Sequence, residues 1–202
     1  ADLGNSFFLD SRKRSYKVNT NKLHFLDIGV SGGPNGAKEG PSIMASGSKS
    51  AWKIVKGIFE DISAKQNNIS ACSFFGNSGN GHLVKMVHNG IEYAFMQTLS
   101  EVSVILKNIF NLNNLEQNKL FSKFSNTDVG SYLLDITSKV ISKKKNNLFY
   151  LDIINNKIDY NGTGNWTINT SLSYGVSIPT IYSAVSTRLL SIHFLKKNKP
   201  NK

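Results

Sequence analysis

The chain has 202 residues, 40% of them hydrophobic, and a formal net charge of +11. This composition excludes a wholly disordered chain, and the length allows one or two domains with a buried core. The basic excess leaves three classes of partner: nucleic acid, an anionic membrane surface, or small anionic substrates. Much of the excess lies in residues 143–145 and 196–202, and neither run contains an aromatic residue. Surfaces that bind single-stranded nucleic acid interleave aromatic residues with basic ones. We therefore interpret both runs as solvated surface and expect no nucleic-acid partner.

The cysteine content and the hydropathy pattern bear on location. Cys72 is the single cysteine, so an intrachain disulfide cannot form, and its short apolar run indicates a small buried residue. No apolar run approaches the length of a membrane span, and no secretory signal is visible at the N-terminus. We expect no membrane association and a cytoplasmic location, in a reducing compartment.

The first part of the chain has an α/β pattern. Residues 24–30 (HFLDIGV) predict a short buried strand, and residues 34–47 are rich in Gly and Ser and predict a loop. Apolar residues recur at helical spacing over 50–65, and 71–75 predict a second strand. Strand, helix and strand in this order indicate the closing part of an α/β sheet.

After Gly81 the pattern becomes helical. A long helix is predicted from His82 to about Phe110, and further helical patterns follow at 115–124, 129–141, 166–174 and 179–195. We therefore expect an α/β domain over residues 1–77 and an all-helical domain over 78–202. The chain starts without an initiator Met and has few strands, so we expect it to be the middle of a longer protein.

The long helix carries polar residues on one side. They stand at i, i+3, i+4 and i+7: Lys85, His88, Asn89 and Glu92. At about 100° per residue, these positions fall within roughly 100° of arc. The other side is apolar, which predicts that it is anchored in a core: Val84, Val87, Ile91, Phe95, Leu99 and Val102. A candidate base, a candidate acid and two orienting groups on one stripe suit proton transfer. The alternative is a solvent-exposed helix face with a Lys–Glu pair two turns apart.

Glycines precede this helix. Gly76, Gly79 and Gly81 permit a tight turn, but their spacing is neither the dinucleotide fingerprint nor a P-loop. Together with Lys85 and Asn89 they fit the pattern G-x-x-G-x-G-x-x-x-K-x-x-x-N, which resembles the signature of the β-hydroxyacid dehydrogenases.

Longer segments of the sequence resemble one particular branch of the β-hydroxyacid dehydrogenases. The string HLVKMVHNGIEYAFMQ is similar to the signature of the 6-phosphogluconate dehydrogenase family. Other similar segments follow in the same order along nearly the whole chain: LGNS (3–6), GVSGG (29–33), GAKEGPSIMASG (36–47), GTGNWT (162–167) and YGVSIPTIYSAVSTRLLS (174–191).

The resemblance implies a fold, a reaction and a set of site residues. The fold is the closing part of a Rossmann-like coenzyme domain, followed by a mainly helical substrate and dimerisation domain. The reaction is oxidative decarboxylation of 6-phosphogluconate to ribulose 5-phosphate by a homodimer, with NADP and without a metal. Lys85 is implied as general base, Glu92 as the acid that protonates C1, and Asn5 as a cofactor contact. The implied substrate contacts are Ser31, Gly32, Gly33, His88, Asn89, Tyr93, Asn165, Thr167 and Arg188.

Three departures from the family keep alternatives open. Asn165 stands where the family has a phosphate-binding lysine, and Leu3 stands where it has glycine. The start of the coenzyme domain and the C-terminal segment, which completes the partner subunit's site, have no counterpart in the chain. The alternatives are another β-hydroxyacid dehydrogenase and a non-catalytic homologue that dimerises or binds polyanions.

Overall fold

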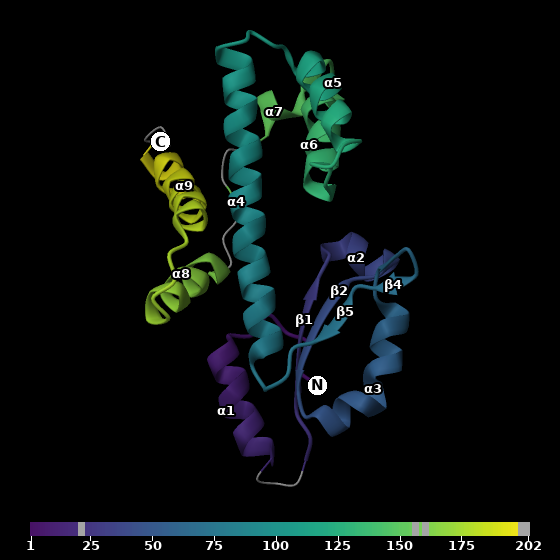
Figure 1. Cartoon of the computed structure of the whole chain (residues 1–202). Helices are drawn as coiled ribbons and strands as arrows, with labels where there is room; N and C mark the ends of the chain where they lie inside the picture. Colours follow the sequence, from purple (N-terminus) through teal and green to yellow (C-terminus); the bar gives the residue numbers. More distant parts are fainter. Residues whose placement is uncertain (20–22, 155–157, 159–161, 198–202) are drawn as a thin grey trace. The chain divides into compact units, whose positions relative to one another are not determined.

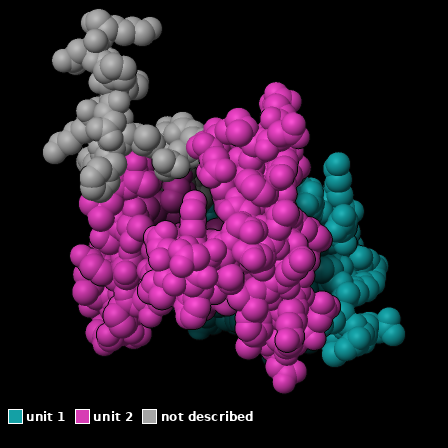
Figure 2. Space-filling model, turned by 90° about the horizontal axis from the view of Figure 1, so that it is seen from above, with its two compact units in different colours: residues 1–89 teal, residues 90–202 magenta. Residues whose placement is uncertain are grey.

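The computed structural model describes residues 1–19, 23–154, 158 and 162–197. The end of the second basic run, residues 198–202, lies outside them. The chain divides into two compact units, Ala1–Asn89 and Gly90–Lys202 (Figure 2). Helix α4 (Asn80–Asn108) begins in the first unit and continues into the second.

A three-stranded sheet forms the centre of the first unit (Figure 1). Its strands are β1 (Leu26–Ser31), β2 (Ser42–Gly47) and β5 (Cys72–Phe74), in the order β1-β2-β5. The β1–β2 pair is antiparallel and the β2–β5 pair is parallel. Asp2 extends the sheet beyond β1, because its N–H donates to the Leu26 carbonyl at 2.8 Å and its carbonyl accepts from Ile28 at 2.9 Å. This N-terminal segment runs parallel to β1.

Helix α3 (Lys49–Ile62) covers the apolar core of this sheet. Ser48 caps the helix by accepting a hydrogen bond from Ala51 at 3.3 Å. Trp52 stacks on Phe74 with ring centroids 5.6 Å apart, and it belongs to the same buried cluster as Ile28. The amphipathic helix and both strands expected in this region are therefore present.

Two helices and one strand of the first unit lack a recognisable apolar pattern. Helix α1 (Phe8–Asn19) buries Phe8, Ser11 and Ser15, so serines provide two of the buried positions on its inner face. The predicted loop over 34–47 is wrong, because helix α2 (Gly33–Glu39) and strand β2 occupy it. The backbone of β2 lies close beneath α4, because a Cβ on Gly81 would stand 2.4 Å from the Met44 carbonyl oxygen.

Two short hairpins close over Asn-Asn pairs. They join β3 (Lys65–Gln66) to β4 (Ile69–Ser70) and β6 (Lys144–Lys145) to β7 (Leu148–Phe149). The four turn residues, Asn67, Asn68, Asn146 and Asn147, have φ between 50° and 64°, as a two-residue type I′ turn requires. In the second hairpin the Lys144 ammonium lies 4.5 Å from the centre of the Phe149 ring. Aromatic residues thus approach the basic run in space, although none interrupts it in sequence.

The second unit is mainly helical, as the sequence predicts, but the β6–β7 hairpin shows that it is not all-helical. Helices α5 (Asn114–Ser125) and α6 (Tyr132–Ser142) pack together, and α7 (Tyr150–Ile153), α8 (Thr163–Ser173) and α9 (Pro179–Lys197) follow. A capping box begins α5, where Asn113 and Glu116 bond each other's backbone N–H groups. The core of α5 and α6 is completed by Leu99 of α4.

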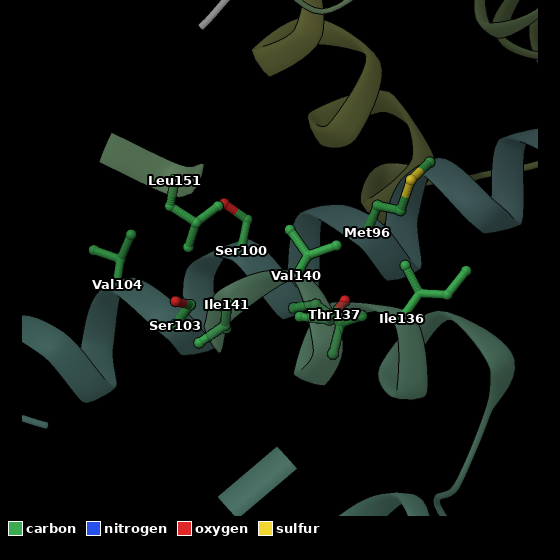
Figure 3. A pocket seen from close by; sticks show the side chains of 10 residues that line it. Met96, Ser100, Ser103, Val104, Ile136, Thr137, Val140, Ile141 and Leu151 are labelled. Carbon is green, nitrogen blue, oxygen red and sulfur yellow. The ribbon is translucent and has the colours of Figure 1, made fainter. Parts of the chain in front are cut away.

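An apolar cavity of about 380 Å³ lies among α4, α6 and α7 in this unit. Figure 3 shows Met96 and Val104 of α4 lining it with Ile136, Val140 and Leu151. The side chains around it include none of the predicted site residues. Among the described residues, none of the helices combines the length and apolar character needed to cross a membrane.

Candidate active site

The first turns of α4 lie directly on the sheet of the first unit. A Cβ on Gly81 would stand 2.6 Å from the Asp27 carbonyl oxygen, so a larger residue does not fit. One turn further, a Cβ on Gly29 would stand 2.4 Å from the Cβ of Lys85. Lys85 therefore leaves α4 immediately above β1, and it is half-buried there. Two glycines, one on each element, make this close approach possible.

Helix α4 runs along β1 in the same direction. Gly81 lies over Asp27 and Lys85 lies over Gly29, so four helix residues, about 6 Å, match two strand residues, about 6.6 Å. Asn89 follows Lys85 by one more turn of α4. Asn89 is buried, with 7% of its surface exposed. The alternative that the polar stripe is a solvent-exposed helix face therefore does not hold at Asn89.

Two segments leave the sheet in the direction in which β1 runs. One is the loop that follows Asp2 and contains Asn5, and the other is the turn from the end of β1 at Ser31 through Gly32 to Gly33, the first residue of α2. Because the two preceding segments are parallel neighbours, both loops leave the same edge, where α/β sheets bind ligands. Gly33 has φ of 58° and open space around its Cβ position, so a ligand could reach its backbone. The structure thus groups four of the predicted residues.

The Asn5 loop is organised by the carboxylate of Asp2. Oδ1 accepts from the Gly4 N–H at 3.0 Å, and Oδ2 accepts from Ser6 at 3.1 Å and from Arg14 at 2.9 Å. Burial raises the pKa of Asp2, but the bonds from Gly4 and Ser6, the charge of His82 and the bond from Arg14 outweigh it. The pKa therefore lies below its usual value of 3.8.

Four side chains gather in the second unit, and we call them the Tyr93 cluster: Tyr93, Thr163, Thr167 and Arg188. The guanidinium carbon of Arg188 lies 3.9 Å from the centre of the Tyr93 ring. The Tyr93 hydroxyl lies 3.5 Å from Oγ1 of Thr163, and Thr167 donates to the Thr163 carbonyl at 3.0 Å. Helices α4, α8 and α9 therefore bring a cation and several hydroxyls together.

Two further predicted residues belong to the second unit. Asn165 is exposed on the first turn of α8, about 200° around the helix from both Thr163 and Thr167. Glu92 is half-buried on α4. Sequence reasoning missed Thr163, although its spacing of i, i+4 to Thr167 places both hydroxyls on one face.

The apolar side of α4 is only partly anchored in a core. Leu99 is buried as predicted, but Val87, Ile91 and Val102 are exposed. Met86 and Asn89 are buried instead, because the side of α4 that meets the sheet of the first unit is the side with Gly81 and Lys85. The expectation of a uniformly buried apolar side is therefore wrong.

Comparison with known proteins agrees with this layout. Residues 1–76 match the NAD binding domain of 6-phosphogluconate dehydrogenase, and residues 81–202 match the C-terminal domain of 6-phosphogluconate dehydrogenase. The NADP-dependent decarboxylating 6-phosphogluconate dehydrogenase of Bacillus subtilis is 40% identical over 94% of the chain, and the decarboxylating enzyme of Dictyostelium discoideum is 41% identical over 94%. The chain spans 41% and 40% of their lengths.

Solved structures give the same result. Plasmodium falciparum 6-phosphogluconate dehydrogenase, solved in its apo form and in complexes with NADP+ and with 6-phosphogluconate, matches 99% of the chain at 35% identity. The TM-score is 0.93, and the match covers 45% of the Plasmodium chain. The 3-hydroxyisobutyrate dehydrogenase of Salmonella typhimurium shares the fold at 16% identity, with a TM-score of 0.67 over 90% of this chain and 59% of that one.

These findings define a protein in which a Rossmann-like NAD-binding domain precedes a mainly helical domain, so the predicted fold class is confirmed. The chain belongs to the 6-phosphogluconate dehydrogenase family. The domain boundary at 77/78 stays a prediction: the contacts divide the chain after Asn89, and the family models meet between residues 76 and 81.

Proposed function

We propose that this chain takes part in the NADP-dependent oxidative decarboxylation of 6-phosphogluconate to ribulose 5-phosphate, within the whole protein to which it belongs. The proposal is carried by the way in which the residues of the family motif gather. Lys85 is seated over β1 in the first unit, and a cation with hydroxyl groups forms the Tyr93 cluster in the second. Family membership supplies the identity of the reaction.

Lys85 serves as the general base. In its neutral form it takes the proton from the substrate's 3-hydroxyl while the hydrogen on C3 leaves as hydride, and a β-keto acid results. Because Gly29 has no Cβ, the Lys85 side chain can start directly over β1, and its four-carbon stem has only to reach along β1 toward Ser31 and Gly32. Asn89, which is buried one turn after Lys85 on α4, holds and orients the substrate with His88.

Glu92 serves as the acid of the second half-reaction. Loss of CO2 from the β-keto acid leaves an enediol, and protonation at C1 then gives the ketose phosphate. Lys85 and Glu92 are seven positions apart on one continuous helix, so two turns of α4 separate the base from the acid on the same stripe. Glu92 is half-buried on this helix.

The Tyr93 cluster binds the substrate's phosphate. The Arg188 guanidinium supplies charge and several N–H donors, and the ring of Tyr93 beneath it limits its orientation. Hydroxyls of Tyr93 and Thr167 add further bonds. Asn165 supplies a neutral amide from its exposed position, so Arg188 carries most of the charge that meets the phosphate.

The loops at the end of β1 fit a dinucleotide cofactor. Asn5 is exposed in the loop after Asp2, and Gly33 offers backbone that no side chain covers. NADP, when bound, accepts the hydride that leaves C3. Asn5 would hold its nicotinamide ribose, and the Ser31–Gly33 loop would place the substrate's carboxylate end beside it.

The protein works as a homodimer in the cytoplasm. The exposed side chains of Val87, Ile91 and Val102 on α4 support an apolar interface with a second copy. The lone cysteine, Cys72, suits a reducing compartment. Light scattering on the full-length gene product tests the dimer, since a monomer at micromolar concentration would contradict it.

The function is tested by following NADPH absorbance with 6-phosphogluconate and the full-length gene product. We expect turnover with release of CO2, and Lys85→Arg should lower kcat by roughly 10²–10⁴-fold because the guanidinium cannot act as a base. Glu92→Gln should lower kcat with the KM nearly unchanged. Turnover of 3-hydroxyisobutyrate but not of 6-phosphogluconate would favour another β-hydroxyacid dehydrogenase. Loss of all turnover would favour a non-catalytic homologue.

A further inference from the structure

A buried cluster of polar side chains, which includes none of the predicted site residues, holds the beginning of α4. Asp27 of β1 is fully buried. Its Oδ1 accepts from the Gly79 N–H at 2.8 Å, and its Oδ2 accepts from the His82 N–H at 3.3 Å and from the Ser46 hydroxyl at 2.7 Å. All three donors point at one carboxylate, so both of its oxygens act as acceptors.

Ser46 extends this contact to the second strand. It is fully buried, and its hydroxyl oxygen accepts from the Gly81 N–H at 2.8 Å while its proton goes to Asp27. Three backbone N–H groups at the start of α4, those of Gly79, Gly81 and His82, are thus bonded to side chains of the sheet. These groups have no partner within a helix, so the bonds complete the helix terminus and fix its position at once.

His82 connects the same helix turn to α1. Its Nδ1 lies 2.6 Å from the hydroxyl of Ser11, and both residues are buried. Helix α1 follows the loop that contains Asn5. The start of α4 is therefore bonded to β1, β2 and α1.

From this arrangement we infer that Asp27 is a positioning residue for Lys85. Lys85 begins one turn after Gly81, directly over Gly29, and Gly29 is two residues along β1 from Asp27. Because a helix is stiff over one turn, a shift of the first turn moves Lys85 by a similar distance. A misplacement of about 1 Å costs about 10²-fold in rate. The inference rests on the proposed function, in which Lys85 is the base.

The test compares Asp27→Asn, Ser46→Ala and the control Asp10→Asn in the full-length gene product. Asn at 27 offers one acceptor oxygen, so its amide N–H₂ must face one of the donors. The Asp10 side chain is half-exposed and lies 3.6 Å from the ammonium of exposed Lys13, so Asp10→Asn is the same chemical change away from the buried contacts. We measure kcat, KM for 6-phosphogluconate, thermal unfolding, and the isotope effect with substrate deuterated at C3.

For Asp27→Asn we expect kcat per folded molecule to fall about 10²-fold, with a smaller change in KM and an increased isotope effect, because a misplaced base makes the chemical step limit turnover. Ser46→Ala should change the same quantities less, and Asp10→Asn should not change them. Loss of folded protein alone would leave the isotope effect unmoved, and that result overturns the inference.

If Asp27→Asn does not fold, Ser46→Ala decides, and an unchanged kcat and isotope effect in that variant also overturns the inference. Absence of turnover in the unmodified protein refutes the proposed function instead.

Discussion

Substitution of Gly29 by Ala tests whether the close approach of α4 to β1 matters for catalysis. The added Cβ would stand 2.4 Å from Lys85 Cβ, 2.8 Å from its Cγ and 2.9 Å from the Gly81 carbonyl oxygen. Carbon atoms in contact lie about 3.5–4.0 Å apart, so α4 must move from the strand by roughly 1 Å or more. Such overpacking costs about 1–3 kcal/mol of stability, and the displacement of the base costs about 10²-fold in kcat.

The matched control is Gly57→Ala. Gly57 lies within α3, has an ordinary helical φ, and has no atom within 4 Å of its Cβ position. Alanine there should raise stability by about 0.5–1 kcal/mol and leave kcat unchanged. Thermal unfolding and NADPH formation by the full-length gene product provide both readouts. If Gly29→Ala melts and turns over like Gly57→Ala, Lys85 is not seated as the structure places it.

Three further predictions concern other parts of the chain. Arg188→Ala should raise the KM for 6-phosphogluconate by roughly ten- to a hundredfold, because a charged hydrogen bond contributes about 1.5–3 kcal/mol; a similar rise with unphosphorylated gluconate would argue against a phosphate contact. Burial, with a smaller contribution from Glu60, raises the pKa of the Cys72 thiol above 9.0. A thiol reagent at neutral pH should therefore modify the folded chain more slowly than the urea-unfolded chain. Equal rates would contradict this prediction. The pKa of Asp2 is lowered on folding, so its carboxylate contributes stability above pH 3.8 that is lost as the pH falls through the folded value. Asp2→Asn should therefore unfold at a lower temperature than the unmodified protein at neutral pH, and a difference that does not shrink in acid would refute this.

The helices of the second unit were predictable because apolar periodicity dominates their sequences. Phe121, Leu134 and Ile141 are buried at helical spacing within α5 and α6, and the predicted spans agree with the observed helices to within a few residues. Helix α1 was not predictable in this way. Its buried positions include Ser11 and Ser15, which bond to His82 and Ser78, so hydrogen bonds fill the place that an apolar stripe fills elsewhere.

The candidate site was predictable as a set of residue types but not as a set of contacts. The motif places Lys85 four residues after Gly81, yet the reason for that glycine lies in β2 and β1, whose carbonyl groups it touches. Asp27 interrupts an apolar strand, and a lone carboxylate in such a strand is a signal that sequence reasoning could have used. Its partners, Ser46 and the backbone of Gly79, are distant in the chain, so the pairing emerges only from the fold.

Helix α4 shows why hydropathy alone misplaced its buried side. The pattern of Val87 and Ile91 predicts the helix correctly, but both side chains are exposed, whereas Asn89 is buried. A base that works beside a sheet must come from the side of the helix that meets the sheet, and at Gly29 and Gly81 that side allows no bulky apolar residue. The polar groups there are stabilised by bonds such as those from Gly79 and His82 to Asp27. The close approach to the sheet and the polar side chains of the stripe thus fall on the same face of α4. In the first unit small and polar residues occupy it, and the apolar side chain of Val87 stays exposed.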